Sequence, residues 1–531
     1  MQPSLIGHWP LSGDAQDHSG QGNHGDNRGA NLDASDGARF DGRTSHILVP
    51  DSPSLQLGPD DFSISAQVYT QAQVDDPLGD ILSKFCPDQR RGFSLGFKRH
   101  SAACTSLANY RNLHFGIDAG HIDDTWTDCG QLGNAIFVMA LCVHQGHLYA
   151  GTCEAHGAGR VFRFDGHQWT DLGAPAPCNA VMSLAPFNGQ LYAGSGRLKL
   201  LGSSLPPSSN THEGGHVFRL QDDQWIDCGK LGGERGDYAE YCHDTVGAFE
   251  VFQSQLYAVP LYTQGLFRYD GDQQWTDCGS YGRRAFTLGA FRDQLHILDN
   301  GNQIIRYASH GDSTTWTRLA ALPGVSQVYS MAVYEGKLVV GTWPQAAVFR
   351  QEDDGSWTDI GRLGDELEVM GMAVYNGKLY AGTLPLGQVY RFDGDGQWTC
   401  TGQLDTTPEV RYRRAWSTAV YRGKLYYGVL PSGKVLSLEA GKNATYDHAL
   451  EPGWRHIAAV RQGGDLSLYV NGEKVGSSSA FNPTDYNLSN DKPLQIGLGQ
   501  HDYFNGRLAD VRLYRGALDI KEIEALSQRV E

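Results

Sequence analysis

The stretch that decides the fold is Val369–Gly402, "VMGMAVYNGKLYAGTLPLGQVYRFDGDGQWTCTG". Asn-Gly and Asp-Gly pairs, which are strong signals for tight hairpin turns, separate runs rich in β-branched and aromatic residues. These runs predict four short antiparallel strands, "VMGMAVY", "KLYAGTL", "QVYRFD" and "QWTCTG".

The same phrase recurs along the chain. Its tryptophan reappears at intervals of about 40 to 56 residues, and a turn followed by Leu, as in "NGKLY", accompanies it. Four strands per repeat at this period are typical of a β-propeller with one blade per repeat. We therefore predict a seven-bladed propeller, marked by Trp126, Trp169, Trp225, Trp275, Trp316, Trp357 and Trp398.

The two ends of the repeat region complement each other. The last repeat, residues 415–439, lacks a W-T-D strand, while a surplus strand "DTWTDCG" around Trp126 precedes the first full repeat. Pairing the surplus strand with the last blade would close the ring and remove two exposed sheet edges. The blades so predicted resemble kelch-type propeller repeats.

The flanks do not repeat. The first flank contains "DHSGQGNHG" and "ARFDGRTSHILV", and the last contains "GWRHIAAV", "LYVNG" and "FNGRLADVRLY". Together they resemble the LamG, or concanavalin A-like, jelly roll, with its opening at one end of the chain and its closing strands at the other. The resemblance implies an all-β protein in which one jelly roll, residues 1–118 and 445–531, carries the propeller, residues 119–444, as an insertion.

LamG-like jelly rolls often hold a structural Ca²⁺, and carboxylate and amide oxygens are its preferred ligands. The resemblance therefore implies candidate ligands in Asp14, Asp17, Asn23 and Asp510, with a plain turn as the alternative. We expect no cofactor to be required for activity.

Composition excludes several function classes. A net charge of −17 argues against a general nucleic-acid binder, and no apolar run is long enough to span a membrane. The start of the chain shows no signal-peptide pattern. Cys129, Cys228 and Cys278 share a repeat position that elsewhere holds Leu or Ile, so we expect buried thiols there. Cys86 and Cys104 are a candidate disulfide pair.

Candidate functional residues lie in the loops that connect the second strand to the third and one blade to the next, because these loops share one face of a propeller. Three of them are long, residues 196–216, 232–245 and 405–417, and they are rich in Arg, Tyr, His and Trp. Aromatic faces stack on sugar rings, and Arg pairs with carboxylate or sulfate. The long loops supply Arg197, His212, Tyr238, Tyr241, His243, Arg411, Arg413 and Trp416; the shorter ones add Glu154, His156, Tyr262, Arg283, Arg284, Trp343 and Glu368.

We predict from this pattern a polysaccharide-degrading enzyme, extracellular or periplasmic, that acts on a uronic-acid-containing or sulfated polysaccharide or oligosaccharide. In a lyase, His243 and Tyr241 would act as base and acid while Arg411 neutralises the substrate carboxylate. A glycoside hydrolase, which needs two carboxyl groups at suitable separation, is one alternative. A secreted glycan-binding or adhesion protein without catalysis is the other, and neither fold alone decides among the three.

Overall fold

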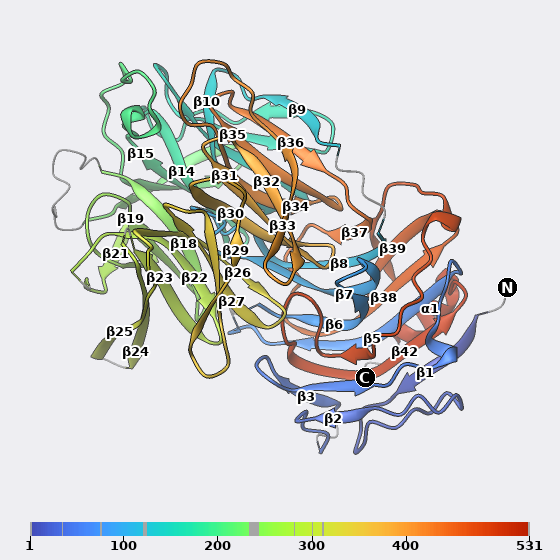
Figure 1. Cartoon of the computed structure of the whole chain (residues 1–531). Coiled ribbons are helices and arrows are strands. Elements are labelled where there is room, and N and C mark those ends of the chain that lie inside the picture. The colour runs from blue at the N-terminus through green and yellow to red at the C-terminus, as the bar shows by residue number, and fades with distance from the viewer. Residues whose placement is uncertain are drawn as a thin grey trace.

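The computed structural model describes residues 3–33, 36–74, 77–120, 125–232, 244–280, 282–299, 301–310 and 313–528. Strands dominate this part of the chain, whose one α-helix is α1 (Ile520–Ser527) and whose 3₁₀ turns are η1 (Pro53–Leu55), η2 (Leu200–Ser203) and η3 (Pro483–Asp485). Figure 1 shows a sandwich that contains both chain ends beside a ring of small sheets. The predicted all-β class with propeller-like blades is confirmed.

The sandwich consists of two seven-stranded sheets, and each draws strands from both flanks. The first contains β1 (Ser4–Trp9), β3 (Ala38–Asp41), β5 (Phe62–Thr70), β38 (Gly453–Gln462), β39 (Asp465–Val470), β40 (Glu473–Ser477) and β42 (Asn505–Arg515). The second contains β2 (Asp26–Arg28), β4 (His46–Val49), β6 (Asp80–Cys86), β7 (Arg91–His100), β8 (Asn109–Ala119), β37 (Lys442–Tyr446) and β41 (Leu494–Ile496).

The two flanks depend on each other for pairing and for burial. Strand β5 lies between β42 and β38, so that Val68 pairs with Leu508 on one side and with Arg455 on the other. Trp9, Phe62 and Leu508 belong to one buried core. Strand β37, which pairs with β8, spans the expected boundary at residues 444–445.

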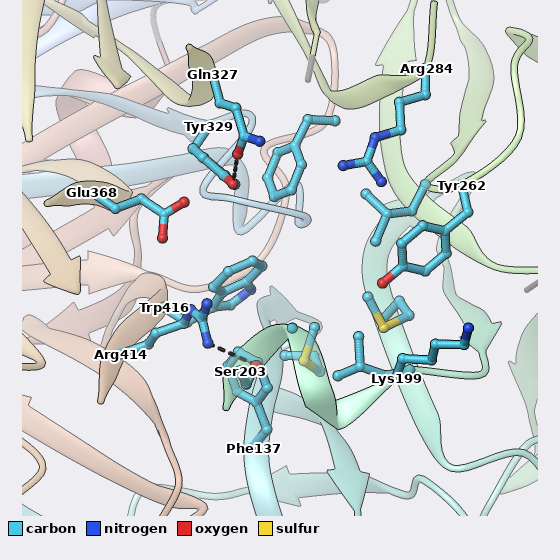
Figure 2. Close-up of a pocket in the computed structure, with 16 residues that line it drawn as sticks. Phe137, Lys199, Ser203, Tyr262, Arg284, Gln327, Tyr329, Glu368, Arg414 and Trp416 are labelled. Carbon is cyan, nitrogen blue, oxygen red and sulfur yellow. Dashed lines mark hydrogen bonds between the residues drawn. The ribbon is translucent and has the colours of Figure 1, made fainter. Parts of the chain in front are cut away.

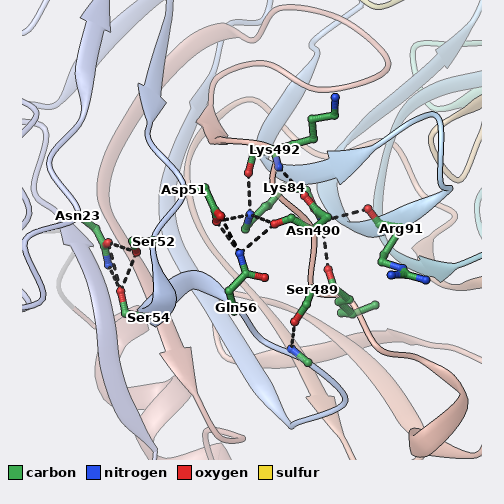
Figure 3. Close-up of polar contacts among 12 residues, drawn as sticks. Asn23, Asp51, Ser52, Ser54, Gln56, Lys84, Arg91, Ser489, Asn490 and Lys492 are labelled. Carbon is green, nitrogen blue, oxygen red and sulfur yellow. Dashed lines mark hydrogen bonds and ion pairs between the residues drawn. The ribbon is translucent and has the colours of Figure 1, made fainter.

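A buried lysine also joins the flanks (Figure 3). The Lys84 side chain is 1% exposed, and its Nζ donates to Asp51 Oδ1 at 2.8 Å and to the carbonyl oxygens of Asn490 at 2.8 Å and Lys492 at 2.6 Å. Gln56 Nε2 donates to the same Asp51 carboxylate. The ammonium is the cation that these oxygens surround, so its desolvation is offset by three hydrogen bonds.

The ring contains five four-stranded sheets and one eight-stranded sheet. The eight-stranded sheet runs through β10 (Ala135–His144), β11 (His147–Glu154), β12 (Val161–Phe164), β13 (Trp169–Asp171), β14 (Ala180–Phe187), β15 (Gln190–Gly196), β16 (His216–Gln221) and β17 (Gln224–Lys230). The next two sheets contain β18 (Val246–Phe252), β19 (Gln255–Pro260), β20 (Phe267–Gly271) and β21 (Gln274–Asp277), then β22 (Ala285–Phe291), β23 (Gln294–Asp299), β24 (Gln303–His310) and β25 (Ser313–Ala321).

The remaining three complete the ring. They contain β26 (Gln327–Tyr334), β27 (Lys337–Trp343), β28 (Ala347–Gln351) and β29 (Trp357–Arg362), then β30 (Glu368–Tyr375), β31 (Lys378–Leu384), β32 (Gln388–Gly394) and β33 (Gln397–Gln403), and finally β34 (Arg414–Tyr421), β35 (Lys424–Leu430), β36 (Lys434–Leu438) and β9 (Thr127–Gln131). In the last sheet Leu436 pairs with Asp128, so the strand after Trp126 supplies the edge that the final repeat lacks.

The repeat tryptophans tie neighbouring outer strands together. In four of them, the indole N–H donates to the carbonyl oxygen of the residue three positions after the preceding repeat's tryptophan. This bond joins Trp169 to Cys129 (3.0 Å), Trp225 to Leu172 (3.0 Å), Trp275 to Cys228 (2.8 Å) and Trp398 to Ile360 (3.0 Å). The recurring phrase therefore encodes contacts between sheets as well as the strands themselves.

A hairpin of the sandwich enters the ring. Residues 101–108, which connect β7 to β8, are all buried. Thr105 Oγ1 donates to Met139 O in β10 at 3.0 Å, and Met331 N in β26 donates to Ala102 O at 3.4 Å. Cys104 lies in this connection and Cys86 ends β6; both are free thiols, so the candidate disulfide is absent.

Candidate functional site

The inner strands of the ring are β10, β14, β18, β22, β26, β30 and β34. A cavity of about 430 Å³ lies where these strands begin (Figure 2). Strands β10, β14, β22, β26, β30 and β34 contribute to its wall, together with the loops that follow β15 and β19. These loops belong to the face that sequence analysis selected. The volume lies within the range of about 300–1,000 Å³ usual for small-ligand pockets.

The wall is built from two positions of the repeat. Each inner strand ends in an aromatic or histidine residue before its hairpin turn, and alternate residues of a strand share a face. The residue seven positions before this terminal residue defines one layer of side chains, and the residue five positions before it defines a second layer. The first layer contributes Phe137, Arg284, Gln327, Glu368 and Arg414 to the lining, and the second contributes Met139, Met182, Phe286, Tyr329 and Trp416.

Charge is unevenly distributed around this wall. Among the described lining residues the cations are Lys199, Arg284 and Arg414, and the one carboxyl group is Glu368. Since the chain as a whole carries a net charge of −17, a cavity with three cations and one acid is a local reversal of sign. The arrangement favours an anionic ligand.

Glu368 is the buried acid of the site. Burial raises the pKa of its carboxyl group, although Arg414 and a hydrogen bond with Tyr329 act in the opposite direction. The Tyr329 hydroxyl, which has one proton to donate, also lies within hydrogen-bond distance of Gln327 Oε1. Burial raises the pKa of Tyr329 well above its usual range, so the phenol is neutral.

The Arg414 side chain is anchored to the loop that follows β15. Its Nη1 donates to Ser203 Oγ at 2.8 Å, and its guanidinium carbon lies 5.9 Å from the centre of the Trp416 ring. Arg414 is 9% and Trp416 7% exposed. Within the described part of the chain, neither Arg414 Nε nor Trp416 Nε1 has a hydrogen-bond acceptor. Both donor atoms are buried within the wall of the cavity and add no exposed polar surface to it.

Arg284 and Tyr262 form the opposite side of the site (Figure 2). The Arg284 guanidinium carbon lies 5.5 Å from the centre of the Tyr262 ring. Burial raises the pKa of the Tyr262 phenol, which Arg284 partly opposes. A cation and a neutral phenol thus face Glu368 and Tyr329 across the space.

Sequence analysis placed Arg284 and Trp416 in the site, and the structure brings them together at the cavity, with Tyr262 and Glu368. The other described candidates do not line it. Arg411 and His212 are exposed, Arg413 Nε donates to Thr407 O, and Glu154 is buried. The remaining candidates outside the lining are Arg197, His156, Arg283 and Trp343. Tyr238, Tyr241 and His243 lie outside the described residues.

Long loops were a poor guide because their charged side chains are free to point into solvent. The sequence-based prediction did not include Gln327 and Tyr329, which lie on a strand, and it assigned Arg414 to the loop before β34, whereas Arg414 is the first residue of that strand. Aligning the repeats on the residue that ends each inner strand would have found them. At these two positions the repeats differ in charge and size.

The residues considered for calcium lie in the sandwich. Asp17 accepts hydrogen bonds from the backbone of His8 and Asn23, and the side chain of Asn23 bonds Ile6 O and Ser54. Asp510 accepts from His8 Nε2 and Arg512 Nε, while Asp14 accepts from Gln16 N. The described residues include no group of three or more His, Cys, Asp or Glu side chains placed to hold a metal. Calcium binding stays a prediction.

Residues 422–524 match the family model of the concanavalin A-like lectin/glucanases superfamily, Laminin_G_3. No curated protein sequence matches the chain. Similar solved structures include a streptogramin B lyase (11% identity, TM-score 0.45, covering 59% of this chain and 96% of that one). Another is YCF48 bound to D1 peptide (10% identity, TM-score 0.41, covering 59% of this chain and 97% of that one). A third is YCF48 from Cyanidioschyzon merolae (9% identity, TM-score 0.41, covering 59% of this chain and 98% of that one). These low scores carry no argument about function.

None of the helices in the described part of the chain is long and apolar enough to span a membrane.

Proposed function

We propose that the protein degrades an acidic polysaccharide as a lyase, with the cavity at the start of the inner strands as its active site. The observation that carries the proposal is the lining: three cations, two neutral phenols and one buried carboxyl group around an aromatic and apolar wall. The cations suit the carboxylate of a uronic acid, and Trp416 and Phe137 offer flat faces to a sugar ring.

The chemistry assigned to the site is β-elimination. Arg284 and Arg414 pair with the substrate carboxylate and stabilise the negative charge that develops when the C5 proton leaves. Ionised Glu368 takes this proton; the C5–H electron pair forms the C4=C5 double bond, and the C4–O4 bond breaks. The Tyr262 phenol on the opposite side donates its proton to the departing oxygen.

Glycoside hydrolysis is less well supported, because it uses two carboxyl groups and the described lining has only Glu368. Glycan binding without catalysis is the second candidate. The three cations and the aromatic wall support it as well, since a binding site needs the same contacts with its ligand.

The test is incubation of the full chain with a panel of uronic-acid and neutral polysaccharides. A lyase produces the ultraviolet absorbance of a double bond conjugated to the carboxylate. Reducing ends that appear without this absorbance would favour the hydrolase. If no polymer is shortened but one retards the protein in affinity electrophoresis, the binding function replaces the enzyme.

Matched variants test the assigned residues. We expect Glu368→Gln to reduce kcat by about 10²–10⁴. Glu366→Gln is the control, because Glu366 is equally buried but accepts from Leu386 N instead of lining the cavity. Arg284→Gln should raise KM, whereas the exposed Arg318→Gln should not. Equal effects within either pair would refute the assignment.

The same proposal includes the finer architecture. Only one residue pair, Cys153 with Ala180, joins β11 to β14, so we count the eight-stranded sheet as two blades and the ring as seven kelch-like blades. We assign residues 119–444 to the ring and 1–118 with 445–531 to the jelly roll. Secretion and glycan binding by the jelly roll are part of this proposal.

A further inference from the structure

The channel beneath the cavity is filled by the β7–β8 hairpin. Its tip is anchored to inner strands on several sides of the ring. Leu107 N donates to Leu184 O in β14 at 3.3 Å, and Val143 N in β10 donates to Ala108 O at 2.8 Å. Asn109 bonds both the N–H and the carbonyl of Val420 in β34, at 2.9 and 2.8 Å.

The hairpin and the cavity use successive parts of the same strands. The cavity is lined by early residues such as Tyr329 in β26 and Trp416 in β34, whereas the hairpin bonds later ones, Met331 and Val420. Cys104, at the hairpin tip, is fully buried and belongs to the apolar cluster that contains Trp416. The hairpin therefore forms the support beneath the cavity floor.

The loop after β15 restricts the cavity from the other direction. Its turn η2 reaches the lining through Gly202 and Ser203, and Ser203 accepts the hydrogen bond from Arg414. Leu200 of the same turn is buried in the cluster that contains Cys104. In the described part of the chain, the hairpin blocks the axis of the ring below the cavity, so a polymer cannot pass through the ring at this end.

We propose that the cavity takes the reducing-terminal acidic sugar of a glycan chain, so that cleavage proceeds one unit at a time from that end. This inference rests on the proposed lyase function. Elimination expels the substituent on O4, and because the hairpin closes the axis below the cavity, the departing chain leaves on the side away from the hairpin. The C1 side of the bound sugar then faces the closed end and carries no further unit.

The products follow from this geometry. Each event breaks C5–H and C4–O4, releases one unsaturated uronate monosaccharide, and leaves a saturated chain shortened by one unit with a new hydroxyl-bearing reducing end. No oxidant or cofactor is consumed. The next event can begin only after the new end enters the cavity.

The test compares oligogalacturonate, oligoguluronate, oligomannuronate and oligoglucuronate of defined length, each native and after borohydride reduction of its terminal ring. We expect native chains to give the unsaturated monosaccharide from the first time point, and reduced chains to lose cleavage. A ladder of product sizes, or equal cleavage of reduced chains, would overturn the inference while leaving the lyase function intact.

A second measurement separates the two failures. Native mass spectrometry of the Glu368→Gln full chain with oligomers of increasing length counts protein molecules per glycan. One molecule per chain at every length supports end recognition, even if no polymer yields a double bond and the lyase proposal fails. Several molecules on longer chains would show interior binding and overturn the inference.

Discussion

The buried ion pair between Arg99 and Glu250 gives the sharpest stability prediction. Arg99 Nη2 lies 2.5 Å from Glu250 Oε1 and donates to Val251 O at 2.6 Å, and the two side chains are 3% and 0% exposed. Arg99 belongs to β7 and Glu250 to β18, so the pair joins the sandwich hairpin to the ring. Replacing Arg99 by Met would leave a carboxylate buried without its counter-charge.

Such a loss costs about 3–5 kcal/mol. For 531 residues unfolding as one unit, an entropy near 2.1 cal/mol/K per residue gives about 1.1 kcal/mol/K, so Arg99→Met should lower the Tm by roughly 3–5 °C. Differential scanning calorimetry measures this shift. The variant Arg99→Met/Glu250→Gln should recover part of it, because the buried charge is gone.

The pH dependence checks the cause. Burial raises the pKa of Glu250 even with Arg99 beside it, so the ionised carboxylate is the unfavourable form in the folded chain. The Tm deficit of Arg99→Met should be small near the ordinary glutamate pKa of about 4.3 and grow as the pH rises through the folded value. A deficit that stays constant over this range, or a double variant no more stable than the single one, would refute the reasoning.

Three further predictions concern other parts of the fold. Trp398→Phe removes the bond to Ile360 O and should cost about 1 kcal/mol of stability, measured by thermal unfolding; no change would mean that the bond between sheets is dispensable. Lys84→Met leaves the carbonyl oxygens of Asn490 and Lys492 without their donor and should cost about 1–3 kcal/mol, seen as a lower urea midpoint, while a neutral result would argue against the internal-cation role. Burial raises the pKa of Asp447 to about 6, so stability should fall as the pH rises from about 4 through 6, and Asp447→Asn should flatten this part of a Tm–pH curve; an unchanged slope would assign it to another group.

The repeat made most of the ring predictable, because hairpin turns and strand patterns are local signals. The tryptophan phrase located outer strands such as β33, and the missing final strand pointed to β9 as its substitute. The jelly roll was predictable from motifs at both ends of the chain, and residues 422–524 match the corresponding family model.

The hairpin inside the ring was not predictable. Residues 101–108, "SAACTSLA", carry neither alternation nor helical periodicity, so they read as an ordinary loop. All of them except Leu107 are small, and small side chains such as Ala102 and Cys104 suit close packing among converging strands. That use depends on long-range geometry, which no local pattern reports.

The site was predictable in part for a related reason. Arg284 and Trp416 were selected by residue type and by loop position, and both line the cavity. Arg411 satisfied the same criteria yet is exposed, because residue type does not say which way a loop side chain points. The strand positions of Tyr329 and Arg414 do fix direction, through the two-residue alternation of a strand.

The hairpin inside the ring also constrains how the chain folds during synthesis. Residues 91–119 leave the ribosome before any strand of the ring, but the sandwich that holds them needs β37 to β42, which are made last. The usual order, in which an N-terminal domain folds before the next one emerges, is therefore unavailable. The sheets of the ring must therefore assemble around a hairpin whose own sheet is still incomplete. A truncated chain ending after β36 should accordingly expose apolar sandwich surface and depend on chaperones until the last strands arrive.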